Sequence, residues 1–266
     1  MQPDTPRTSR PRRLPPPRPA RWALALAGAL VLGTSPPAGA DAATPAPPDL
    51  TTVLQRFQAA QDALTTFQPR FAQEKKLPML KDRLRSSGQL YFHLPDRLLW
   101  RFEEPEPSLI LIKNGELLNW RIAQKKAAVV KDVEKKQRRL FEYFGIGGNV
   151  MKYQKRFTCT LTVEDAPAPE AAPRFHLTLI PKSRRVAKHL ARVEIWLDGD
   201  HYLPARVEYH NPDGGYTKFA FSTIQLNQGI DPETFEVSLP DDITIDHSLD
   251  KVPLDAPAGE HASLGG

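Results

Sequence analysis

The sequence predicts a mainly β protein with a few helices, built around a curved antiparallel sheet. Short segments rich in β-branched and aromatic residues follow one another from residue 67 onward, with turn sequences such as Asn114-Gly115 and Asp213-Gly214-Gly215 between them. Apolar and polar residues alternate within these segments, as in a sheet with one dry face. No segment supports a helical crossover between parallel strands, so we expect neighbouring strands to be antiparallel.

Residues 1–40 have the order of a secretory signal peptide. An Arg- and Pro-rich start precedes an apolar run from Trp22 to Leu32, and small residues follow as far as Ala40. The run is too short for a spanning helix, which needs roughly 20 residues. We expect a cleaved signal peptide over residues 1–40, a periplasmic location, an Ala/Pro linker over 41–48 and a disordered tail over 249–266. An uncleaved anchor or a basic tail is the alternative for the leader.

The net charge of +5 comes from this leader. Residues 1–40 hold six Arg and one Asp, whereas the rest of the chain carries 30 basic and 30 acidic residues. A neutral body gives no electrostatic reason to expect a nucleic-acid partner. The single Cys excludes an internal disulfide and a Cys-based zinc cluster, and the seven His lack the spacing of metal ligands. We therefore expect neither a nucleic-acid partner nor a metal.

One helix is expected first, and strands follow it. Apolar residues recur at spacings of three, four and seven from Leu50 to Phe67, which predicts an amphipathic helix with Asp49 as its N-cap. The period then becomes two, and we expect strands over residues 67–74, 88–94, 97–103, 108–113, 116–122, 127–132, 157–163, 174–180, 192–198, 204–210 and 217–227. Residues 133–151 are expected to form a short helical piece interrupted by glycines, and residues 166–173 a loop.

The alternation assigns apolar residues of four strands to one dry face. These residues are Leu90, Phe92, Leu94, Leu98, Trp100, Phe102, Leu118, Trp120, Ile122, Val193, Ile195 and Leu197. One helix and a short helical piece cover only part of so wide an apolar surface. The pattern alone leaves two interpretations open: an ordinary core, or a curved sheet and lid that enclose an apolar ligand cavity.

Several motifs occur in an order that points to a known family. They are Phe67-Gln68-Pro69-Arg70-Phe71-Ala72-Gln73-Glu74-Lys75-Lys76, Gly88-Gln89-Leu90-Tyr91-Phe92, Pro95-Asp96, Leu99-Trp100, Pro105 and Asn114-Gly115. In their order and spacing these motifs resemble LolA, the family of periplasmic carriers of outer-membrane lipoproteins. The resemblance covers roughly residues 50 to 245.

The resemblance implies an open half-barrel of antiparallel strands with a helical lid around an apolar cavity, over residues 49–248. It implies a carrier without catalytic residues or cofactor, which shields the acyl chains of lipoproteins. We expect a monomer that accepts acylated lipoproteins from an inner-membrane lipoprotein-releasing transporter and passes them to an outer-membrane acceptor. The lipid-binding residues would be those of the dry face, together with Leu140, Phe141 and Phe144 of the expected lid.

The sequence departs from the family at one position of the lid latch. Family members carry an Arg immediately before the Pro that matches Pro95, and this Arg latches the lid. Here that position is Leu94, which adds apolar lining and offers no hydrogen bond. The alternative to a carrier is a periplasmic sensor or regulatory module of the same half-barrel type, which binds a protein partner.

Overall fold

A computed structural model describes residues 48–165 and 172–246. Within this range the side chains of Lys135, Lys136, Arg139, Leu140, Tyr143 and Asp246 are not described. The expected signal peptide, residues 41–47 of the expected linker and the expected tail over 249–266 lie outside the described residues. So do residues 166–171 of the expected loop.

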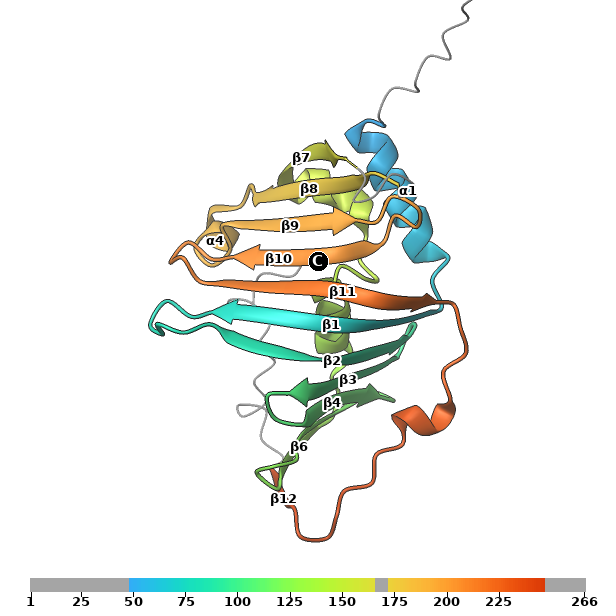
Figure 1. Ribbon diagram of the computed structural model, residues 1–266, viewed down its shortest axis with the longest axis vertical. Helices are drawn as coiled ribbons and strands as arrows, with labels where there is room; N and C mark the ends of the chain where they lie inside the picture. Colours follow the sequence, from blue (N-terminus) through green and yellow to red (C-terminus); the bar gives the residue numbers. More distant parts are fainter. Residues whose placement is uncertain (1–47, 166–171, 247–266) are drawn as a thin grey trace, which may run out of the picture. The chain divides into compact units, whose positions relative to one another are not determined.

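The strands of the described residues form one sheet in the order β12-β6-β5-β4-β3-β2-β1-β11-β10-β9-β8-β7 (Figure 1). Neighbours pair antiparallel, as predicted, except that β12 and β6 are parallel. The two edge strands do not pair with each other, so the sheet is open. The strands are β1 (Thr66–Lys76), β2 (Leu84–His93), β3 (Arg97–Glu104), β4 (Ser108–Lys113), β5 (Glu116–Arg121), β6 (Lys126–Val130), β7 (Phe157–Glu164), β8 (Arg174–Pro181), β9 (Arg192–Leu197), β10 (Pro204–His210), β11 (Tyr216–Leu226) and β12 (Thr244–Asp246).

The centre of the sheet joins two wings that are distant in sequence. Strand β1 pairs with β2 on one side and with β11 on the other, so β1–β6 form an N-terminal wing and β7–β11 a C-terminal wing. Figure 1 shows β1 in cyan beside β11 in orange. The register of β1 against β11 shifts between Gln68 and Arg70. Pro69 lies at this shift, where its lack of a backbone N–H interrupts the ladder least.

Helix α1 (Leu50–Asp62) begins where the sequence predicts. The Oδ1 atom of Asp49 accepts a hydrogen bond from the backbone N–H of Thr52 at 2.7 Å, which confirms the N-cap. The helix ends earlier than predicted, because residues from Thr66 onward join the ladder of β1. None of the helices in the described part of the chain combines the length and the hydropathy needed to cross a membrane.

The segment between β6 and β7 contains α2 (Glu134–Tyr143), η1 (Val150–Lys152) and α3 (Tyr153–Arg156). Gly145 ends α2 in the left-handed region, with φ +74°. The backbone N–H of Ile146 donates to the carbonyl of Phe141 at 3.0 Å, and that of Gly145 to Glu142 at 2.9 Å. These two bonds form a Schellman motif, and its apolar pair, Phe141 and Ile146, is buried. The two remaining short helices of the described residues are α4 (Arg184–Ala187) and η2 (Pro232–Phe235).

Most of the core lies on one face of the sheet, which we call the inner face. It carries Leu90, Phe92, Leu98 and Trp100, and the same cluster takes in α1 and the segment after β6. A second, smaller cluster lies on the other, outer face of β2–β5. It contains Leu99, Leu109, Leu111 and Phe235, with Tyr91, Leu118, Trp120, Ile230 and Val237 packed against it. The residues around η2 therefore cover the outer face of the N-terminal wing.

Strands β2 and β3 approach each other closely at Gly88, which leaves no room for a side chain. A Cβ atom at this position would lie 2.0 Å from the carbonyl oxygen of Arg101, a backbone atom that cannot rotate away. We expect Gly88→Ala to lower the free energy of unfolding by about 1–3 kcal/mol, as overpacking does. Gly229→Ala is the control, because nothing lies within 4 Å of its added methyl group. Equal urea midpoints for the two variants would contradict the close approach.

Candidate ligand cavity

The structure brings most of the predicted lining residues together on the inner face. Leu90, Phe92, Leu98, Trp100, Val193, Ile195 and Leu197 are buried in one cluster with Phe141 and Phe144, and Leu94 and Phe102 are partly buried against it. Leu140 belongs to α2, and its side chain is not among those described. That these residues contact a lipid stays a prediction.

The face predicted for Leu118, Trp120 and Ile122 is wrong. In the β4–β5 ladder Leu118 pairs with Leu111 and Trp120 with Leu109, and paired residues of antiparallel strands share a face. Leu118 and Trp120 thus belong to the outer cluster, and Ile122, beyond the end of β5, is 39% exposed. Both faces of the β4–β5 strand pair are covered, so apolar residues occupy the inward-facing and the outward-facing positions. Alternation therefore cannot assign the face.

Four inner-face residues that sequence reasoning missed come from the same ladder. Asn119 pairs with Ile110, and Leu117 with Ile112, so these four side chains face the inner cluster. The signal in the sequence is the unbroken apolar run from Leu109 to Ile112, which indicates a strand buried on both faces.

The segment from Val133 to Val150, which we call the lid, packs its aromatic rings against the inner face. The ring of Phe144 lies 4.9 Å from Trp100, 5.2 Å from Phe219 and 5.5 Å from Phe92, measured between centroids. Phe141 contacts Phe92 at 5.2 Å. Phe144 is fully buried, so the lid fills the middle of the inner face with its own side chains.

Side-chain hydrogen bonds between described residues attach the lid to its surroundings. The Nε2 atom of Gln137 donates to the carbonyl of Pro95 at 3.0 Å, and that of Gln61 to Gly145 at 3.1 Å. The Oε1 atom of Gln58 accepts from the backbone N–H of Val150 at 2.8 Å. Gln137 thus bonds the residue that follows Leu94, in the turn between β2 and β3. A latch Arg before this Pro would donate to the lid, whereas here the lid donates to the turn.

Beside the lid, the inner face remains open as a cavity of about 550 Å³. Trp100, Phe102 and Ile110 form its apolar part, and Pro105 and Leu84 extend it. Polar and basic residues complete the lining: Gln73, Lys75, Arg83, Arg85, Ser86, Ser108, Asn119 and Arg121. The volume lies within the range of about 300–1,000 Å³ that is usual for small-molecule sites.

This arrangement of sheet, lid and cavity agrees with a family assignment made on sequence. The family model described as "Outer membrane lipoprotein carrier protein LolA" matches residues 62–238. The chain belongs to the LolA family. The resemblance found in the motifs is thereby confirmed. A search of curated protein sequences finds no match to the chain.

Several solved structures are similar to this chain in fold. The MucA/MucB complex of Pseudomonas aeruginosa matches at 15% identity and a TM-score of 0.47, over 71% of this chain and 60% of that one. The lipoprotein LppX of Mycobacterium tuberculosis matches at 10% and 0.46, over 69% and 99%. A LolA superfamily protein of Nitrosomonas europaea matches at 12% and 0.34, over 70% and 97%. At these identities the likeness concerns the fold.

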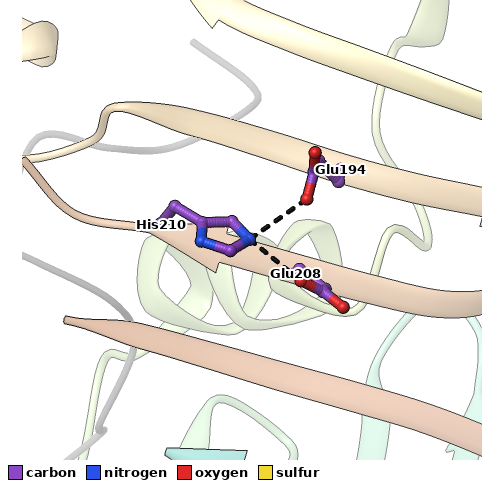
Figure 2. A group of neighbouring side chains, drawn as sticks. All are labelled: Glu194, Glu208 and His210. Carbon is purple, nitrogen blue, oxygen red and sulfur yellow. Dashed lines mark hydrogen bonds and ion pairs between the residues drawn. The ribbon is translucent and has the colours of Figure 1, made fainter. Parts of the chain in front are cut away.

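The outer face of this LolA family member carries a group of titratable residues, Glu194, Glu208 and His210 (Figure 2). The Nε2 atom of His210 lies 3.1 Å from Glu194 and 2.9 Å from Glu208. Three ligand atoms of this kind lie within 4.8 Å of one another, as a metal site requires. However, Arg206 and Lys218 also contact Glu208, so the carboxylate already has cationic partners. We interpret the group as an ion-pair network that satisfies buried charges on the outer face.

Glu208 is the buried member of this network, with a side chain only 3% exposed. Burial by itself raises the pKa of Glu208, but the hydrogen bond and charge of Arg206, with His210 and Lys218, outweigh it and bring the pKa below 4.5. Ionised Glu208 therefore stabilises the fold above pH 4.5, and this contribution is lost as the pH falls further.

The network predicts a pH-dependent stability difference. We expect Glu208→Gln to lower the free energy of unfolding by about 1–3 kcal/mol at pH 7, because Arg206 and Lys218 lose their charged partner. The difference should shrink as the pH falls below 4.5 and through the lowered pKa of Glu208, because the native carboxylate then takes up a proton. Urea unfolding of both proteins across this range measures it, with exposed Glu106→Gln as the control. A constant difference at all pH values would contradict the assignment.

The lid bond of Gln137 predicts a local effect. Gln137→Met keeps the length of the side chain but cannot donate to Pro95. We expect amide hydrogen exchange in the lid to become about fivefold faster, in line with one lost hydrogen bond. Gln124→Met is the matched control, because Gln124 bonds Arg121 outside the lid. Unchanged exchange in Gln137→Met would show that the bond to Pro95 does not hold the lid.

Proposed function

We propose that this protein is a periplasmic carrier that shields the acyl chains of lipoproteins on the inner face of its sheet. The observation that supports this proposal most directly is the cavity beside Trp100, Phe102 and Ile110, next to a lid that covers the same apolar surface. An ordinary core would need neither an opening to solvent nor a separable cover. The family assignment points to the same class of protein.

The free energy of acyl-chain transfer sets what such a carrier has to provide. Each methylene removed from water contributes about 0.8 kcal/mol, so a chain crosses an aqueous space only on a comparable apolar surface. In the structure the rings of Phe141 and Phe144 occupy part of that surface. Cargo larger than the open cavity therefore has to displace them, and the lid competes with the cargo for the inner face.

This competition limits how tightly the carrier holds its cargo. The free energy of lid packing is subtracted from that of acyl burial, so an acceptor without such a lid binds the same chains more tightly. We infer the direction of transfer from this difference: from an inner-membrane lipoprotein-releasing transporter to the carrier, and from the carrier to an outer-membrane acceptor. A signal peptide over residues 1–40 would direct the chain to the periplasm. There the carrier would act as a monomer.

The proposal predicts loss of cargo binding without loss of the fold. Phe102 lines the cavity and is partly exposed, so a carboxylate there keeps contact with water. We expect Phe102→Glu to reduce capture of a purified triacylated lipoprotein by at least about tenfold, because burying the chain beside a charge costs several kcal/mol. Val163→Glu is the control, since Val163 lies on edge strand β7 and is 38% exposed.

Two results would reject the carrier. One is undiminished lipoprotein capture by a folded Phe102→Glu variant, which would place the cargo elsewhere. The other is the absence of acyl lipid from the native protein purified from periplasm, together with a stoichiometric protein partner. That second result would favour the sensor or regulatory module instead.

A further inference from the structure

The cavity contains polar groups that the shielding of hydrocarbon chains does not use. Asn119, which is 7% exposed, lines the cavity, and no hydrogen bond of its side chain is found in the described part of the protein. A ligand oxygen beside Asn119 would give its side-chain amide an acceptor.

The charge of the cavity lining has a single sign. Lys75, Arg83, Arg85 and Arg121 line it, and none of its described lining residues is acidic. Glu74, outside this lining, pairs with Arg83 at 3.4 Å and with Arg85 at 3.1 Å. The hydrogen bond from Tyr216, followed by those two arginines, lowers the pKa of Glu74, so this carboxylate is ionised at neutral pH.

One carboxylate does not neutralise the three arginines of the lining, Arg83, Arg85 and Arg121. The pairs of Glu74 are also solvent-exposed, with the Arg83 and Arg85 side chains 56% and 74% accessible, and exposed pairs contribute little. Arg121 bonds only the neutral Gln124 among its described partners, at 3.2 Å. The rim therefore keeps a net positive charge next to the apolar floor formed by Trp100, Phe102 and Ile110.

We propose that this cavity binds a single-chain amphiphile with an anionic head group, such as a fatty acid or a lysophospholipid. Its chain lies on Trp100, Phe102 and Ile110, an oxygen near the head accepts from Asn119, and the basic rim holds the negative charge. The volume of about 550 Å³ suits one small ligand and leaves the lid closed. The inference rests on the proposed function in one respect, because the apolar floor belongs to the proposed acyl-binding surface.

The test compares two probes that differ only in the charge of the head group. Calorimetric titration of the protein with dodecanoate and with dodecanol, at pH 8 and low salt, measures both dissociation constants. We expect dodecanoate to bind at least about tenfold more tightly, since charge-assisted hydrogen bonds are worth 1.5–3 kcal/mol. The double variant Arg83→Gln/Arg121→Gln should abolish this preference, whereas Arg174→Gln/Arg184→Gln, with both changes outside the cavity lining, should keep it.

A second variant examines the amide donor. Asn119→Leu keeps a side chain of similar size in the lining and removes the N–H groups, and we expect it to weaken dodecanoate binding about fivefold. Thermal unfolding verifies that each variant is folded. Equal affinity of the native protein for both probes, or an unchanged preference in Arg83→Gln/Arg121→Gln, would overturn the inference.

The outcomes separate this inference from the proposed carrier. Lipoprotein capture without dodecanoate binding overturns the anionic-lipid site and leaves the carrier standing. Selective dodecanoate binding without lipoprotein capture rejects the carrier and supports the anionic-lipid site.

Discussion

The apolar inner face has to be kept from water, and the other features of the structure depend on how the chain covers it. Burying apolar surface contributes about 25 cal/mol per Å², and this face extends over both wings of the sheet. Helix α1 and the lid supply the cover that a closed barrel would supply by itself. A cover that comes from a separate segment, and is attached by few polar contacts, is also one that a ligand is able to replace.

The outer face of the sheet differs in composition between the two wings. On the N-terminal wing it is apolar, and the residues around η2 seal it permanently. On the C-terminal wing it is charged, and Glu194, Glu208 and His210 with their cationic neighbours satisfy one another there. The inner face instead keeps an apolar floor of Trp100, Phe102 and Ile110 next to an open cavity, and this is why we place the ligand site there.

The sequence was sufficient for the fold class and for much of the site, and its failures have a physical cause. Alternation identifies the dry face of β2, β3 and β9 because only one side of these strands carries large apolar residues. It fails at β5, where Leu118 and Leu117 are both covered, and a pattern cannot choose between two apolar phases. The basic rim was also missed, because Arg83 and Arg121 come together only through the order of the strands, which local periodicity does not encode.

The pairing of the last strand has a consequence for how the molecule is made. Strand β12 completes the edge of β6, and Phe235 completes the outer cluster of the N-terminal wing, although both are near the end of the chain. Strand β1 likewise receives its second neighbour only when β11 exists. During synthesis from the N-terminus, the N-terminal wing lacks the residues that complete its core. Its strand edges stay unpaired until β11 and β12 have been synthesised. The N-terminal wing thus completes its folding late. A product that ends before residue 230 exposes unpaired strand edges, which favour aggregation and proteolysis.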